Sequence, residues 1–420
     1  MLKNYLKIAF KVFLRRKFFT FISLFAISFT LIILMVVTAM LDNFFGQQPP
    51  ENKAGRTLSV FGMRFQGPNT RSTGSAGYAF LDRYVRTLPN VEKVSILSTP
   101  NMVYSFWKGE KIKSNLKRTD GQFWEVLEFK FLEGGPFTAE DEKNANFVAV
   151  INEATRRKFF GDEQAVGKMI EADGQQFRVV GVVANAPIFR VIPFADIWIP
   201  ISASKTNAYK SQLLGGGFMA TILARSAADL PAIKSEFQSR LAHVEFPDTR
   251  EYNQAIGGAD THFEFASRML IPSRDSAKGM ESQPKILLAT IIALMALFMV
   301  LPTVNLININ VSRILERASE IGVRKAFGAS SWTLVGQFIV ENVLLTLIGG
   351  VIGFLGSIFV LKTISESGLI PYAEFHLNYR IFLYGLLIAL FFGLFSGVYP
   401  AWKMSRLNPV QALKGAGGAR

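Results

Sequence analysis

The sequence of 420 residues contains no cysteine and only three histidines. The absence of cysteine excludes disulfide bonds, thiolate metal sites and a cysteine nucleophile, and three histidines leave little material for a histidine-built metal centre. We therefore expect no metal ion or other cofactor in this chain. Charged residues are also scarce, at 19% of the chain against about 25% in ordinary soluble domains. Half of the chain is hydrophobic and 38 residues are phenylalanine, which excludes a disordered chain and favours a membrane protein.

The usual signatures of catalysis are missing as well. The chain has no G-x4-G-K-S/T, H-E-x-x-H or G-x-S-x-G motif. The segment from Gly161 to Lys168 resembles a phosphate loop, but five residues separate its glycines and Met169 follows the lysine. We predict a turn that leads into a strand there, and a non-catalytic subunit without an ATPase of its own.

Four long apolar runs lie along the chain, and a helix over each would cross a hydrocarbon core of about 30 Å. We predict transmembrane helices over 18–41, 286–312, 332–361 and 381–402. The residues between the first two runs, 42–285, have a globular composition. The expected fold class is an integral membrane α-helical protein, with one plus three transmembrane helices and a large mixed α/β extracytoplasmic domain.

The net charge of +14 is concentrated in the segments that flank the apolar runs. Segments 1–17, 313–331 and 403–420 hold 14 basic and 2 acidic residues, whereas 43–285 holds 30 basic and 26 acidic ones. By the positive-inside rule, these three segments and both termini are cytoplasmic, and 42–285 is periplasmic. The 362–380 segment is then a short external loop. We expect a multi-pass protein of the inner (cytoplasmic) membrane and no nucleic-acid partner.

The N-terminal segment has two open readings. Lys3, Lys7, Lys11 and Arg15 recur every four residues, which indicates a basic amphipathic helix over 1–17 that lies in the membrane interface. The alternative is a charged flank that only sets orientation. The 18–41 run is about twice as long as a signal-peptide core, and no A-x-A-like site follows it, so we favour an uncleaved anchor over a cleaved signal peptide.

The external domain shows short apolar runs bounded by glycine and proline, which indicate a mixed α/β fold. We predict strands at 147–151, 176–183 and 197–201, helices at 153–160 and 231–241, and loops over 46–77 and 202–217.

The cytoplasmic segment 313–331 is predicted to form a coupling helix that docks onto a partner. Oppositely charged residues four positions apart support a helix, and apolar residues supply one side of it. The alternative is a solvated turn between two spans, which would need far fewer residues. The docking candidates are Arg313, Glu316, Arg317, Glu320, Ile321, Gly322, Val323, Arg324, Lys325, Phe327 and Gly328.

Two features stand out inside the 332–361 run. Glu341 is a carboxylate about ten residues into an apolar segment, where an exposed charge is costly. A structural or interfacial role is favoured over proton relay because no intramembrane His, Lys or Arg partner accompanies it. Gly349, Gly353 and Gly356 allow close helix packing, within the bundle or across a dimer.

Three stretches carry a family resemblance. Residues 320–330 (EIGVRKAFGAS), with Gln337, Phe338 and Glu341, resemble a stretch of the MacB/FtsX-type permeases of ABC transporters. Residues 399–413 are similar to the closing motif of that family, with Met404 where a small residue is usual. In the external domain, residues 152–168 and 179–183 are similar to the MacB-type periplasmic core domain.

The resemblance implies a permease subunit that moves its periplasmic domain when a separate cytoplasmic ATPase, which uses ATP and Mg, hydrolyses nucleotide. It implies a homodimer, or a heterodimer with a paralogous permease, and efflux or extraction of an amphipathic substrate such as a drug, peptide, lipid or lipoprotein. A periplasmic adaptor and outer-membrane channel would accompany that role. The alternative is an FtsX-like regulator of a cell-wall hydrolase or a peptide sensor. The size of the external domain favours transport.

Overall fold

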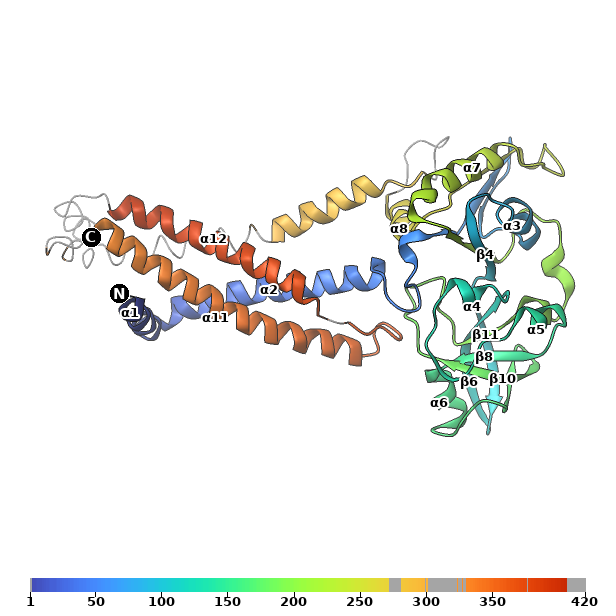
Figure 1. Cartoon of the computed structure of the whole chain (residues 1–420), viewed down its shortest axis with the longest axis horizontal. Helices are drawn as coiled ribbons and strands as arrows, with labels where there is room; N and C mark the ends of the chain where they lie inside the picture. The colour runs from blue at the N-terminus through green and yellow to red at the C-terminus, as the bar shows by residue number, and fades with distance from the viewer. Residues whose placement is uncertain are drawn as a thin grey trace. The chain divides into compact units, whose positions relative to one another are not determined.

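In the computed structural model, the described residues are 2–271, 281–298, 300, 323, 327, 330–375 and 377–405. The chain divides into two compact units. The helical unit comprises Met1–Leu41, Ala289–Leu369 and Phe375–Arg420, and the α/β unit comprises Asp42–Leu288 and Ile370–Glu374. Figure 1 shows the chain with many of its helices and some of its strands labelled.

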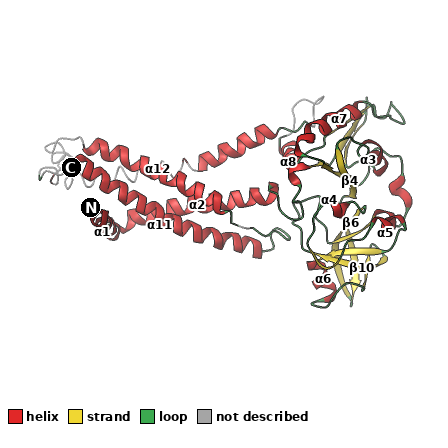
Figure 2. Cartoon of the chain, in the orientation of Figure 1, coloured by secondary structure: helices red, strands yellow, loops and turns green. Residues whose placement is uncertain are grey.

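The described part of the helical unit consists mainly of helices (Figure 2). They are α1 (Leu2–Arg15), α2 (Lys17–Phe45), α11 (Ser331–Glu366) and α12 (Tyr379–Ser405), together with an apolar helix over Pro284–Phe298. Among the described residues, Lys17–Phe45 and Val335–Glu366 are long and apolar enough to cross a membrane, while Pro284–Phe298 and Tyr379–Phe391 are shorter apolar helices. Of the predicted 286–312 span, residues 299 and 301–312 lie outside the described residues.

Helix α1 packs against α11 through Ala9, Phe13 and Leu345. On α2, the rings of Phe21, Phe25 and Phe29 stack in a row on an exposed face. Such a face has no partner in water, and it suits a helix that lies against lipid.

The large sheet of the α/β unit has ten strands, in the order β1-β12-β4-β6-β11-β8-β10-β7, with β5 paired to β6 and β9 to β10. Its strands are β1 (Thr57–Val60), β4 (Val91–Ser98), β5 (Asn101–Trp107), β6 (Glu110–Thr119), β7 (Phe131–Gly134), β8 (Val148–Asn152), β9 (Met169–Ala172), β10 (Gln175–Val183), β11 (Ile197–Pro200) and β12 (Phe218–Ala224).

The predicted strands at 147–151, 176–183 and 197–201 are confirmed to within one residue at each end by β8, β10 and β11. The predicted helices correspond to α6 (Glu153–Phe160) and α7 (Leu230–Ala242). Asn152 ends β8 and caps α6, because its side chain accepts a hydrogen bond of 2.8 Å from the amide of Thr155. The segment from Gly161 to Lys168 is a turn that leads into β9, as expected.

The prediction of a loop over 46–77 is wrong. This segment contains β1, β2 (Met63–Gln66) and β3 (Arg71–Gly74), and the last two form a second sheet in the order β13-β2-β3 with β13 (Gln254–Gly257). Each strand is four residues long, too short to show a period. Two of them also pair with strands more than 150 residues away in sequence, β1 with β12 and β2 with β13.

Three buried apolar clusters fill the α/β unit. One lies under β1, β4 and β12, a second among β6, β8, β10 and β11, and a third around Trp124 and Trp198. The remaining helices are α3 (Tyr78–Tyr84), α4 (Phe123–Val126), α5 (Ala139–Lys143) and α8 (His262–Leu270).

Candidate functional site

The chain passes between the two units after Leu41, Leu288, Leu369 and Glu374. Within the α/β unit, residues near these crossings converge on the loop that joins β10 to β11, residues 184–196. We call the set Asn43, Gly46, Glu51, Arg190, His262 and Glu374 the polar junction, of which Asn43, Glu51 and Arg190 are buried.

Arg190 is the centre of the polar junction, with 1% of its surface exposed. One guanidinium nitrogen, Nη1, lies 2.8 Å from Oε2 of Glu51. The other, Nη2, donates to the carbonyls of Asn43 and Gly46, each at 2.8 Å. These carbonyls belong to the end of α2 and the residue after it, where backbone acceptors lack partners within the helix. Arg190 therefore fixes the end of α2 to the β10–β11 loop.

Two further segments reach the same junction. Nε2 of His262, the first residue of α8, lies 3.1 Å from Oε1 of Glu51. The side-chain amide of Asn43 donates to the carbonyl of Glu374 at 2.6 Å. The start of α8 and the segment between α11 and α12 are thus connected to the residues that hold the end of α2.

The segment Ile370–Glu374 also contacts the β10–β11 loop directly. The hydroxyl of Tyr372 donates to Oδ1 of Asp196 at 2.7 Å, and the amide of Ile188 donates to the carbonyl of Pro371 at 3.3 Å. Asp196 is itself fixed, because its other carboxylate oxygen accepts from the backbone and side chain of Asn115. Burial and the neighbouring Asp196 raise the pKa of the Tyr372 phenol, so the hydroxyl stays a proton donor.

Lys117 of β6 also holds the β10–β11 loop. Its fully buried amine donates to the carbonyls of Val191 and Ile192 at 2.7 and 2.6 Å. Burial lowers the pKa of this amine to about 7, and the charge of Glu51 opposes that shift. A neutral amine has two N–H groups, which matches the two carbonyls.

The buried ion pair of the polar junction is that between Arg190 and Glu51. Removing one partner from a buried ion pair is strongly destabilising, because it leaves the other charge uncompensated. Loss of either Arg190 or Glu51 should therefore weaken the contact between the end of α2 and the β10–β11 loop.

The structure describes two of the predicted docking residues, Val323 and Phe327, and both side chains are exposed. The others, Arg313, Glu316, Arg317, Glu320, Ile321, Gly322, Arg324, Lys325 and Gly328, lie outside the described residues. The docking role of this segment remains a prediction.

Glu341 and the predicted packing glycines lie on α11. Glu341 is 2% exposed and accepts a hydrogen bond of 2.8 Å from the side chain of Gln337. The three glycines face α2: a Cβ on Gly349 would come within 2.8 Å of Ile27, one on Gly353 within 3.0 Å of Leu31, and one on Gly356 within 2.6 Å of Ile32. A Cβ at Gly349 would come within 2.9 Å of the Cβ of Ile27, whereas at Gly356 the nearest atom is the mobile Cδ1 end of Ile32.

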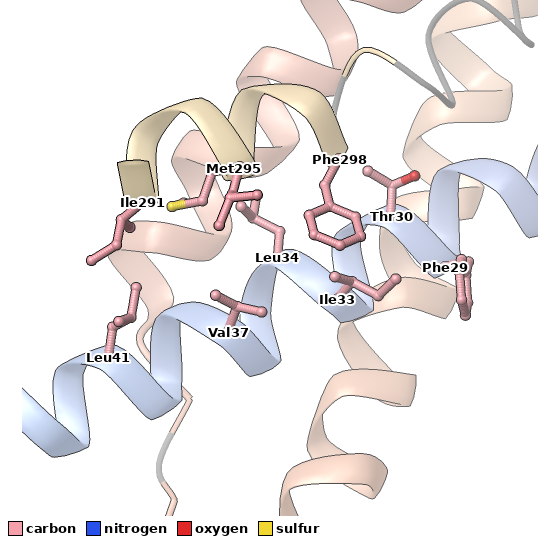
Figure 3. Close-up of a pocket in the computed structure, with 10 residues that line it drawn as sticks. Phe29, Thr30, Ile33, Leu34, Val37, Leu41, Ile291, Met295 and Phe298 are labelled. Atoms are coloured by element: carbon pink, nitrogen blue, oxygen red, sulfur yellow. The ribbon is translucent and has the colours of Figure 1, made fainter. Parts of the chain in front are cut away.

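An apolar cavity of about 440 Å³ lies between α2 and the Pro284–Phe298 helix (Figure 3). Side chains from the two helices point toward each other across it, and the lining residues are Phe29, Thr30, Ile33, Leu34, Val37, Leu41, Ile291, Leu294, Met295 and Phe298. Thr30 is the sole residue among them with a polar side chain, so the cavity suits an apolar occupant.

Sequence reasoning missed the polar junction. One signal was available: Arg190 stands alone among Ile188, Phe189, Val191 and Ile192, and a lone charge in an apolar run needs a buried partner. The identity of that partner was not accessible, because Glu51 and Asn43 lie about 140 residues away along the chain.

The comparisons with known proteins agree with this architecture. Residues 20–240 match the MacB-like periplasmic core domain, and residues 292–409 match the FtsX-like permease C-terminal domain. An uncharacterized ABC transporter permease of Bacillus subtilis, YknZ, is 23% identical over 367 residues, which cover 86% of this chain and 85% of YknZ.

A longer relative is the macrolide export ATP-binding/permease protein MacB of Bdellovibrio bacteriovorus. It is 28% identical over 285 residues, which cover 66% of this chain but 40% of that protein. Among solved structures, the periplasmic region of MacB from Actinobacillus actinomycetemcomitans aligns with a TM-score of 0.38 at 16% identity, over 53% of this chain and 98% of that one.

The match to the periplasmic core domain alone spans more than half of the chain, and the permease match spans much of the remainder. Both agree with the resemblance seen in the sequence motifs. This chain therefore belongs to the ABC transporter permeases of the MacB and FtsX type.

Proposed function

We propose that this permease subunit couples ATP hydrolysis by a separate cytoplasmic ATPase to movement of its periplasmic α/β domain, and so drives efflux or extraction of an amphipathic substrate. The observation that carries this proposal is the polar junction. Arg190, Glu51 and Asn43 connect the end of α2, the start of α8 and the segment between α11 and α12 to one loop of the α/β domain. A displacement of the helices would reach the domain through these contacts.

We also propose that the chain crosses the inner membrane four times, that both of its termini are cytoplasmic, and that two permease subunits form a dimer. The four apolar runs and the placement of basic charge support this topology. Membership of the permease family supports a partner ATPase, which we place on residues 313–331. The name of the Bdellovibrio bacteriovorus relative, a macrolide exporter, supports an amphipathic cargo.

The ATPase docking surface can be tested by charge reversal. We expect Glu320→Lys with Arg324→Glu to abolish co-purification of the ATPase in mild detergent while membrane insertion stays intact. The control is Lys362→Glu with Glu366→Lys, which reverses an exposed ion pair at the other end of α11. Normal recovery of the ATPase with the Glu320 and Arg324 variant would contradict the assigned role of this segment.

The transmission itself can be measured as a distance. The chain has no cysteine, so a single cysteine in the variant Leu213→Cys can be spin-labelled specifically. Leu213 is exposed in the α/β domain. In a dimer, the two labels report one distance between the protomers. We expect this distance to differ between nucleotide-free and ATP-bound complexes. We also expect Arg190→Met to suppress the difference while ATPase binding persists, whereas Arg250→Met, at an exposed arginine, should leave it unchanged.

Two results would count against the proposal. One is a label distance that is the same in both nucleotide states of the wild-type complex. The other is recovery of a cell-wall hydrolase in place of transport partners, which would favour the FtsX-like regulatory function.

A further inference from the structure

Besides the cavity between α2 and the Pro284–Phe298 helix, the protein has a pocket in the α/β unit. This pocket adjoins the polar junction, and half of its lining residues are phenylalanine. We call it the aromatic pocket. It holds about 400 Å³ and is lined by Phe44, Phe45, Phe61, Phe189, Val191, His262, Phe265, Ala266, Met269 and Leu270. That volume falls within the range of about 300–1,000 Å³ that is usual for small-molecule sites.

Stacked rings form the walls of the aromatic pocket. The rings of Phe44 and Phe189 stack with centroids 4.0 Å apart, and those of Phe61 and Phe265 with centroids 4.1 Å apart. Aromatic pairs in such geometries stabilise each other beyond the effect of the area that they bury. At the rim, Met269 and Leu270 of α8 are 67% and 68% exposed, an uncovered apolar pair beside an apolar cavity.

A polar pocket of about 270 Å³ shares Phe45 and His262 with the aromatic pocket. Its lining includes Gln47, Lys53 and Thr261, and the carboxylates of Glu51 and Asp260. Phe45 and His262 therefore separate an apolar volume, the aromatic pocket, from a volume lined by hydrogen-bonding groups, the polar pocket. A purely apolar molecule would leave the second volume unused, whereas an amphiphile would use both.

We propose that the aromatic pocket binds the apolar body of a small amphiphile, an acyl chain or a fused-ring system, whose polar head lies toward His262 and the adjoining polar pocket. This proposal rests on the proposed transport function, and it assigns the position at which the transported substrate binds. Phe189 and Val191 line the pocket and flank Arg190 in sequence, so an occupant would contact the β10–β11 loop directly beside the polar junction. Occupancy and the coupling contacts would therefore affect one another.

Photoaffinity labelling of the full chain in lipid nanodiscs tests this site. The first probe is a soluble dodecylamine analogue that carries a diazirine near its terminal methyl group, and the second is a phosphatidylcholine with a diazirine in one acyl chain. Modified peptides are mapped by mass spectrometry, so partition of a probe into the lipid does not obscure the position. We expect labelling at Phe44, Phe189 or Phe265, with competition by unlabelled dodecylamine. Labelling there by the soluble probe indicates a free amphiphile, and labelling there by the lipid probe indicates a membrane lipid.

Two variants act on the pocket in different ways. Ala266→Phe fills it with a ring, and Leu270→Glu places a charge at its rim, which is unfavourable next to an apolar ligand. Each should reduce labelling at the pocket at least about tenfold. The control, Leu213→Glu, places the same charge at a leucine that is also 68% exposed but lies away from the pocket, and it should label as wild type does.

The site is overturned if neither probe modifies the pocket residues, or if both pocket variants label as strongly as the Leu213→Glu control. The nucleotide-dependent change in the Leu213→Cys distance is measured independently. A normal distance change without pocket labelling would reject the binding site and leave the proposed transport function standing, whereas loss of the distance change would reject the function.

Discussion

At the scale of single residues, Arg190 carries the most consequential set of contacts in the α/β unit. Its guanidinium binds one carboxylate and two carbonyls in a region almost closed to solvent. The planar fork of an arginine can reach all three at once, which the single ammonium group of a lysine cannot do with the same geometry. We expect a lysine at this position to substitute poorly.

Replacement of Arg190 by methionine should destabilise the α/β unit by about 3–5 kcal/mol, because the Glu51 carboxylate is left buried without its partner. For a unit of this size the apparent Tm of the full chain in detergent should fall by roughly 10 °C. Glu51→Gln combined with Arg190→Met removes both charges and should recover part of the loss. An equal Tm for the single and the double variant would show that the charge of Glu51 is not the cause.

Lys117 predicts a pH dependence of stability. The pKa of its amine is about 7 in the folded protein against 10.5 for a lysine side chain in water. Between these two values the unfolded chain binds a proton that the folded chain does not, so the free energy of unfolding rises as pH rises from about 7 to 10.5. The slope from this one group can reach about 1.4 kcal/mol per pH unit.

Urea unfolding of wild type and Lys117→Met at several pH values between about 7 and 10 isolates this contribution from that of other titrating groups. The difference in unfolding free energy between the two proteins should grow in favour of wild type as pH rises. Parallel pH profiles would mean that the folded-state pKa of Lys117 is not lowered.

At the scale of secondary-structure elements, the contact between α2 and α11 depends on the absence of side chains. Gly349→Ala would place a Cβ 2.8 Å from Cγ2 and 2.9 Å from Cβ of Ile27. We expect a loss of about 1–3 kcal/mol from overpacking, measured as a lower melting temperature in detergent.

The matched control is Gly336→Ala on the same helix, where the nearest atom would be Cε2 of Tyr5 at 3.9 Å. The methyl group of an alanine fits at this position. The substitution should leave the melting temperature unchanged or raise it, because alanine is more favourable than glycine in a helix by about 1 kcal/mol. Equal effects of the two substitutions would argue against close packing at Gly349.

The elements that could be predicted from sequence are those with local signals. Helix α6 has a cap at Asn152 and a glycine at its end, and β10 has a long apolar run, so both were placed correctly. Strands β1 and β2 were missed because they pair with distant strands, and β3 was missed because its four residues are too few to show a period. The polar junction and the segment Ile370–Glu374 were missed for the same reason: each depends on contacts between residues far apart in sequence.

At the scale of the whole molecule, the predicted topology places residue 369 outside the cell membrane and residue 14 inside. Leu369 and Leu14 are 79% and 69% exposed, and the chain has no other thiol to interfere. In intact spheroplasts, a membrane-impermeant maleimide should label Leu369→Cys at once and Leu14→Cys only after permeabilisation. Labelling of both sites without permeabilisation, or of neither, would contradict the odd number of spans, three, that the predicted topology places between residues 14 and 369.

The membership of Ile370–Glu374 in the α/β unit has a consequence for biosynthesis. Most of that unit is translated by Leu288, yet Asn43 and Asp196 obtain partners from Glu374 and Tyr372, which leave the ribosome more than 80 residues later. The α/β unit is therefore complete only after α11 has been synthesised. A chain in which Ile370–Glu374 fails to reach this unit would lose the partner of the Asn43 side-chain amide and one partner of Asp196, and proteases could distinguish it from a chain assembled correctly.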